Sequence, residues 1–118
     1  MRLPIQYALT YPERSNYAFE KLSLADVGTL TFQKPDTDTF RCLPLCIAAI
    51  NEGGLRPTAV NGANEEAVRL FLEGKIKFLQ IAELVEKAAY SVENKKDFGL
   101  DDILYIDKTA RQAVLNNI

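Results

Sequence analysis

The clearest periodicity in the chain lies in residues 78–88, which read FLQIAELVEKA. Five apolar side chains recur there at the spacing of one helical face: Phe78, Ile81, Leu84, Val85 and Ala88. Two glutamates and a lysine lie opposite them. The pattern predicts an amphipathic helix that packs one narrow face against neighbouring elements.

A second helix is predicted upstream, in a pattern that turns helical from about residue 37. Its apolar stripe is formed by Leu43, Cys46, Ile47 and Ile50. Pro44 fits only the first turn, because its missing N–H costs little there. Gly53 and Gly54 end the helix.

Two further helices are predicted from caps and stripes. Asn61 is expected to cap one that ends at Gly74, with an inner face of Ala63, Ala67, Leu70 and Phe71. Asp107 is expected to cap the last one, with an inner face of Ala110, Ala113 and Val114. Four short helices joined by brief loops predict a mainly α fold, a small helical bundle over residues 37–118.

Residues 1–36 read differently from the rest. They hold three of the five prolines, and no helical stripe is sustained. Residues 29–33, TLTFQ, alternate in polarity and favour a short β-strand, which Pro35 then ends. We expect an irregular arm that packs on another surface.

The composition excludes several classes of function. The chain has 118 residues, 14 basic and 16 acidic, with a formal charge of −2, which is not typical of a nucleic-acid binder. Histidine is absent, which removes histidine-based acid–base chemistry and histidine metal sites from a chain acting alone. No stretch approaches the roughly 20 apolar residues of a membrane span. Cys42 and Cys46 are expected to be buried or half-buried thiols, compatible with the cytoplasm.

Carboxylate pairs offer a metal-binding alternative to structural roles. Asp36 with Asp38, and Asp101 with Asp102, could chelate a cation in a small hydrolase. An Asx turn and a helix start explain them better, because carboxylates complement both. Glu65 and Glu66 would likewise lie in a first helical turn.

The segment 61–65, NGANE, is the most unusual polar motif. Its two asparagines could bind a ligand through their amides. The other interpretation is a tight cap in which the small residues Gly62 and Ala63 permit close backbone approach. Lys95 and Lys96 form a short solvated pair, and Gly53-Gly54 lacks the lysine of a phosphate-binding loop.

In the order and content of several sequence blocks, the chain resembles the 1-deoxy-D-xylulose 5-phosphate reductoisomerase family. The matching blocks run in order through residues 1–14, 30–36, 42–54, 57–68, 71–81 and 102–111. Two positions depart from the family pattern: Arg41 stands where a proline is frequent, and Gly62 replaces the first alanine of an Asn-Ala-Ala-Asn-Glu motif.

The resemblance implies a C-terminal part of a larger enzyme. Residues 1–11 would end the catalytic domain, residues 12–36 would be the linker, and residues 37–118 the bundle. The family converts 1-deoxy-D-xylulose 5-phosphate to 2-C-methyl-D-erythritol 4-phosphate with NADPH and Mg²⁺ or Mn²⁺, as a homodimer, in non-mevalonate isoprenoid biosynthesis. The missing N-terminal and catalytic domains would then be its partners.

The resemblance transfers no catalytic residue and no metal ligand to this chain, and none of the cofactors is expected to bind the chain alone. Met1 aligns with a family methionine near the nicotinamide, and is the one cofactor-contact candidate. The expected role of this piece is structural, without activity of its own. The alternative is a stand-alone helical protein-interaction module.

Overall fold

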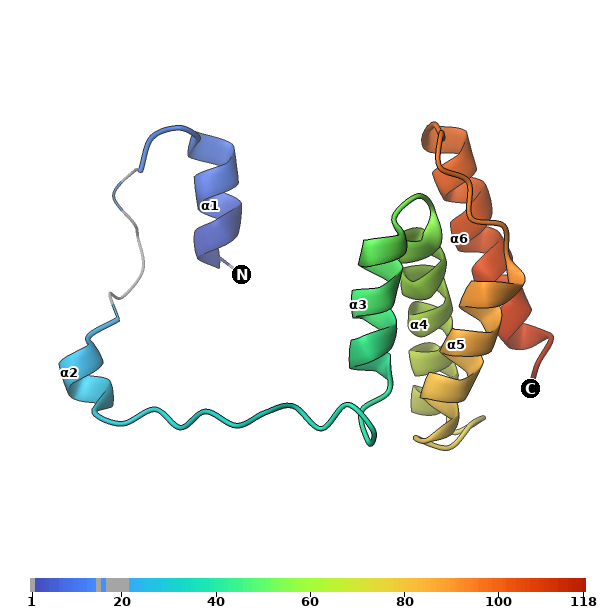
Figure 1. Ribbon diagram of the computed structural model, residues 1–118, viewed down its shortest axis with the longest axis horizontal. Coiled ribbons are helices and arrows are strands. Elements are labelled where there is room, and N and C mark those ends of the chain that lie inside the picture. The colour runs from blue at the N-terminus through green and yellow to red at the C-terminus, as the bar shows by residue number, and fades with distance from the viewer. Residues whose placement is uncertain (1, 15, 17–21) are drawn as a thin grey trace. The chain divides into compact units, whose positions relative to one another are not determined.

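The computed structural model describes residues 2–14, 16 and 22–118, and the chain divides into two units, Met1–Lys34 and Pro35–Ile118 (Figure 1). Among the described residues, none of the helices combines the length and the apolarity that a membrane span requires.

The described residues of the first unit contain two helices, α1 (Arg2–Thr10) and α2 (Leu24–Val27). The sequence did not predict α1. None of its apolar side chains is buried, so they need not recur at the spacing of one helical face, which is the pattern by which a helix is predicted. Pro4 lies in the first turn of α1, where backbone N–H groups lack helical partners anyway. The strand predicted at 29–33 is wrong: these residues have no regular structure, since a strand needs a partner strand to pair with.

The second unit is a bundle of four helices, as predicted. They are α3 (Cys42–Glu52), α4 (Arg56–Leu72), α5 (Gln80–Ser91) and α6 (Leu100–Leu115). Helices α4 and α5 each contact the other three, and α4 packs most extensively, while α3 contacts only α4 and α5 (Figure 1). The core is built of small and branched side chains, among which Leu55, Leu70, Val85 and Val114 are the largest that are fully buried.

Two predicted helix starts are wrong. Helix α4 begins at Arg56, so Asn61 lies inside it and caps nothing, because Pro57 already fits the first turn. Helix α6 begins at Leu100, so Asp107 lies mid-helix. Its start is instead set by Asp102, whose Oδ2 accepts a hydrogen bond from the Gly99 N–H at 2.9 Å.

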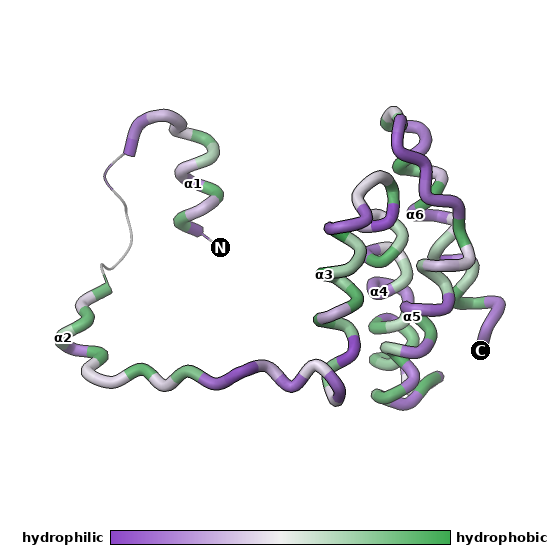
Figure 2. The backbone as a smooth tube through the Cα atoms, viewed as in Figure 1, coloured by the Kyte–Doolittle hydropathy of each residue, from purple (hydrophilic) through white to green (hydrophobic). Residues whose placement is uncertain are grey.

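The inner face predicted for α3 is also wrong. Leu45 and Ala49 are buried, whereas the predicted stripe, including Ile47 and Ile50, faces outward. Helix α3 is apolar on both sides between its hydrophilic ends, so periodicity could not select the buried side (Figure 2).

Candidate functional site

The structure places the predicted site residues in separate local motifs. Met1, the cofactor-contact candidate, lies outside the described residues. Asp36 forms the expected Asx turn: its Oδ1 accepts hydrogen bonds from the backbone N–H groups of Asp38 and Thr39 at 3.1 and 3.0 Å. The Thr39 hydrogen bond is the main reason that the pKa of Asp36 lies below its usual value.

Asp101 and Asp102 lie in the first turn of α6, as predicted. Asp102 also accepts a hydrogen bond from the Lys95 ammonium at 2.8 Å, which is the largest influence lowering the pKa of that carboxyl. Within the described part of the chain, no group of three or more acidic or cysteine side chains is arranged to hold a metal ion.

The two cysteines differ in their surroundings. Cys42 begins α3 and is half-buried, while Cys46 is exposed, contrary to the expectation for that thiol. Burial raises the pKa of the Cys42 thiol, and the neighbouring Cys46 raises it further. Both thiols are free.

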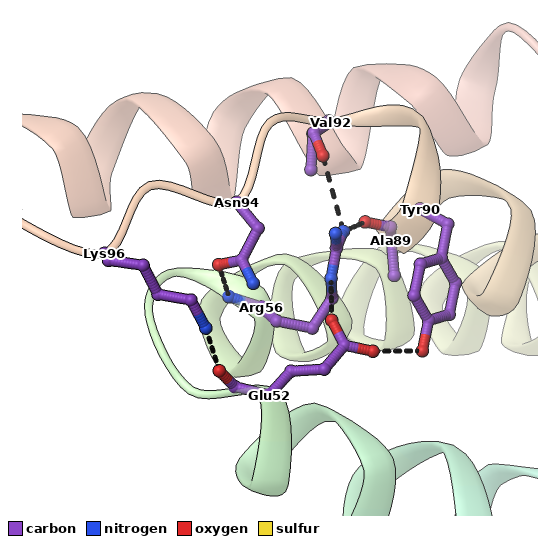
Figure 3. A network of polar contacts seen from close by, with 7 residues as sticks. All are labelled: Glu52, Arg56, Ala89, Tyr90, Val92, Asn94 and Lys96. Carbon is purple, nitrogen blue, oxygen red and sulfur yellow. Dashed lines mark hydrogen bonds and ion pairs between the residues drawn. The ribbon is translucent and has the colours of Figure 1, made fainter.

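The most developed polar cluster surrounds Arg56, at the start of α4. Its guanidinium donates to the Glu52 Oε2 at 2.9 Å and to the carbonyl oxygens of Ala89 and Val92, at the end of α5 (Figure 3). It also lies over the ring of Tyr90, 4.5 Å from the centroid. The arginine is only 9% exposed, so one side chain joins α3, α4 and α5 in the interior.

Glu52 and Tyr90 complete the cluster at its outer edge. The Tyr90 hydroxyl donates to the Glu52 Oε1 at 2.8 Å (Figure 3). That hydrogen bond is the main cause of opposite pKa changes: the pKa of Glu52 is lowered, and that of Tyr90 is raised. The arrangement stabilises a carboxylate and a neutral phenol, a pair suited to holding helices rather than to exchanging a proton.

The turn between α3 and α4 packs against the loop after α5. The Asn94 Oδ1 accepts from the Arg56 backbone N–H at 3.0 Å, and Lys96 donates to the Glu52 carbonyl oxygen (Figure 3). Gly54 has a φ of +65°, and a β-carbon there would lie 2.6 Å from both the Asn94 Oδ1 and the Lys95 carbonyl oxygen. Glycine is therefore required twice at this point, for conformation and for space.

A second set of polar side chains lies on α4 and α6, which pack against each other. Glu66 is buried on α4 and accepts a hydrogen bond from the Arg69 Nε at 3.2 Å. Gly62 lies one turn earlier, against the backbone of Asp107, which confirms the expected close approach although not its predicted place at a cap. Asp107 in turn accepts from the Arg111 Nε at 2.8 Å.

Sequence reasoning missed the Arg56 cluster. The sequence alone assigns Arg56 no role, and nothing in the spacing of Tyr90 and Asn94 links them to Arg56. The only hint in the sequence was an arginine next to a proline that can start a helix. This local pattern does not reveal hydrogen-bond partners 33 to 38 residues away. These polar groups are bound to one another, so the cluster holds the bundle together and presents no free nucleophile or base.

Comparisons with known proteins show which family the chain belongs to. Residues 1–113 match the family model described as the DXP reductoisomerase C-terminal domain. The chain is 48% identical over 114 residues to the 1-deoxy-D-xylulose 5-phosphate reductoisomerase of Clostridium perfringens (strain SM101 / Type A), covering 97% of this chain and 30% of that protein. The enzyme of Acetivibrio thermocellus gives the same identity and coverage.

Solved structures give the same assignment. A Zymomonas mobilis 1-deoxy-D-xylulose 5-phosphate reductoisomerase in complex with NADPH matches with a TM-score of 0.84 and 36% identity, over 98% of this chain and 31% of that one. A DOX-P reductoisomerase in complex with NADPH, fosmidomycin and magnesium matches with a TM-score of 0.75, over 97% of this chain and 30% of that one. The chain thus spans less than a third of the length of these relatives.

Proposed function

Because the chain belongs to the DXP reductoisomerase C-terminal domain family, we propose that it is the C-terminal part of a 1-deoxy-D-xylulose 5-phosphate reductoisomerase. The complete enzyme would rearrange and reduce 1-deoxy-D-xylulose 5-phosphate to 2-C-methyl-D-erythritol 4-phosphate, with NADPH as reductant and Mg²⁺ or Mn²⁺ as Lewis acid. Apart from a contact proposed below for Met1, both cofactors would be held by domains outside this chain. The present piece would act as their support.

The observation that carries this proposal is the surface of the first unit. No residue that the structure describes between 2 and 34 is buried, although the unit holds many large apolar side chains. Leu9, Leu22 and Phe32 are 82%, 76% and 88% exposed. Such a segment gains little stability by itself, so it is suited to lying on another domain.

We assign three consecutive segments of the chain to parts of the complete enzyme. Residues 1–11 would complete the catalytic domain, residues 12–36 would form the linker, and residues 37–118 the bundle. The boundary between the two units at residues 34 and 35 supports the end chosen for the linker. Met1 would contribute an apolar thioether contact near the nicotinamide.

The remaining assignments belong to the whole enzyme. It would be a homodimer, assembled largely through its catalytic domains as the family resemblance implies. A cytoplasmic location is supported by the two free thiols, since such thiols persist in reducing compartments.

A chimera tests the proposed function. The C-terminal 30% of the Clostridium perfringens enzyme is replaced by this chain, and NADPH oxidation with the sugar phosphate is followed. We expect the chimera to turn over and the purified 118-residue chain to give no activity. Turnover by the chain alone, or a folded but inactive chimera, would contradict the proposal.

The same chimera tests Met1. Met1→Ala should raise the KM for NADPH more than that for the sugar phosphate, because the proposed contact is to the nicotinamide. Met1→Leu, which keeps the apolar volume, is the matched control and should retain the parent KM. Equal effects on both substrates would remove Met1 from the cofactor site.

A further inference from the structure

Helix α3 has an outer face that the bundle leaves uncovered. It is formed by Leu43, Ile47 and Ile50, which are 41%, 51% and 71% exposed, and Cys46 lies exposed in the same stripe. The opposite side of α3 packs on α4 and α5 through Leu45 and Ala49. We call the outward stripe, residues 43, 46, 47 and 50, the α3 outer face.

The charge pattern of α3 distinguishes this face from an ordinary solvated surface. Between Cys42 and Asn51 the helix carries no charged side chain. A helix of a globular protein that lies at the surface normally carries polar residues opposite its buried stripe. A helix apolar on both sides is typical of one that is covered on both sides.

The other exposed apolar side chains in the bundle are less suited to docking. Phe71 and Phe78 contact each other, with ring centroids 5.8 Å apart, so part of their surface is already paired. On α6, Leu104 and Tyr105 alternate with charged neighbours such as Asp101 and Lys108. Leu72 and Leu79, which are 77% and 74% exposed, lie within two residues of the charged side chains Glu73 and Lys77. Of the four bundle helices, α3 alone has an exposed apolar stripe within a run of residues that carries no charge.

Two occupants compete for this face: a second copy of the chain, and the remainder of the enzyme polypeptide. A standard interface buries about 800 Å² on each partner, far more than three apolar side chains and a thiol supply. A contact within one polypeptide needs less area, because the tether raises the effective concentration of the partner surface. The relatives extend for more than twice the length of this chain outside the matched part, which supplies such a surface.

We propose that the α3 outer face is a docking surface for an apolar patch on the domains that precede this chain in the complete reductoisomerase. This inference rests on the proposed function and names the surface through which the bundle would brace the catalytic domain. The first bundle helix begins seven residues after the unit boundary, so the face is close in sequence to the linker. Docking there would fix the bundle at its linker end.

Cys46 is a natural probe of this contact, because its thiol lies within the face. Alkylation by iodoacetamide is followed by peptide mass spectrometry in the free chain and in the Clostridium perfringens chimera described above. We expect Cys46 to react at least tenfold more slowly in the chimera. A Leu104→Cys variant, 59% exposed in the parent on α6, is the matched control and should react equally in both proteins.

The outcomes separate this inference from the function on which it rests. An active chimera in which Cys46 reacts as fast as in the free chain overturns the docking surface and leaves the proposed function standing. An inactive but folded chimera overturns both. A free chain that sediments as a dimer, becomes monomeric on Ile47→Asp and protects Cys46 only as a dimer would make a second copy the occupant.

Discussion

At Gly62, a single missing β-carbon sets the spacing of two helices. A β-carbon there would lie 2.7 Å from the Asp107 Oδ1 and 2.9 Å from the Asp107 carbonyl oxygen, and the carbonyl cannot swing aside. Alanine would gain about 1 kcal/mol of helix propensity, whereas overpacking costs about 1–3 kcal/mol.

We therefore expect Gly62→Ala to lower the free energy of unfolding by about 1 kcal/mol, as measured by urea denaturation of the chain. Asn61→Ala is the matched control, because Asn61 is an exposed neighbour on the same helix, where alanine adds helix propensity without meeting α6. A Gly62→Ala variant as stable as the parent would show that α4 and α6 separate without cost.

Arg56 concentrates more interactions than any other polar residue of the cluster at the α3–α4 turn. Arg56→Met keeps the apolar stem but leaves the carbonyl oxygens of Ala89 and Val92 without this donor. We expect a loss of about 2–3 kcal/mol in the free energy of unfolding, because buried acceptors are left unpaired.

Arg41→Met is the matched control for Arg56→Met. Arg41 is half exposed and pairs with the equally exposed Glu86, so its removal should cost about 1 kcal/mol or less. Equal losses in the two variants, in the same urea titration, would mean that Arg56 is not a buried connector of α3, α4 and α5.

At the scale of single elements, the sequence predicted the existence of all four bundle helices better than their beginnings. Asn61 and Asp107 are good capping residues, yet both lie inside helices whose backbones continue through them. Helix α4 extends upstream because Pro57 and the Arg56 cluster stabilise its first turn, and the partners of Arg56 are distant in sequence. Capping preference is local, so tertiary contacts of this kind override it.

Glu66 on α4 makes the stability of the bundle depend on pH. Glu66 is 7% exposed, and the pKa of its carboxyl is lowered mainly by the Arg69 hydrogen bond, with added attraction from Arg111 on α6. A carboxyl with a lower pKa in the folded state stabilises the fold above its unfolded pKa of about 4.3. That stabilisation is lost as the pH falls through the lower, folded value.

We expect the urea midpoint of the chain to fall as the pH is lowered from about 5 towards 3, and Glu66→Gln to reduce this fall. Part of the fall should remain in Glu66→Gln, because other carboxylates, including Glu52, also have lowered pKa values. Glu65→Gln, a change at an exposed neighbour on the same helix, is the control and should leave the fall as in the parent. An unchanged slope in Glu66→Gln would remove Glu66 from the acid response.

At the scale of the whole molecule, periodicity predicted the helices of the bundle, although not the buried face of α3, and it did not predict the structure of the arm. The stripe predicted over residues 78–88 is buried from Ile81 onward, because α5 has a genuine polar side: Ile81, Leu84, Val85 and Ala88 are buried, whereas Phe78 precedes α5 and is 63% exposed. The arm and α3 have no polar side that would mark the opposite side as the buried one. Their apolar residues are exposed in this chain, so no pattern within it could tell which side they would bury.

This difference between the two units predicts how a protease divides the chain. Leu30 and Phe32 are 58% and 88% exposed in a segment without regular structure, so chymotrypsin should cut there first under native conditions. The bundle should survive as a fragment beginning within a few residues of position 33, because its cleavage requires unfolding of a packed core. Mass spectrometry of a time course measures the order of cuts. Early cuts within α4 or α5, or an arm that resists as long as the bundle, would show that the two units do not differ in stability.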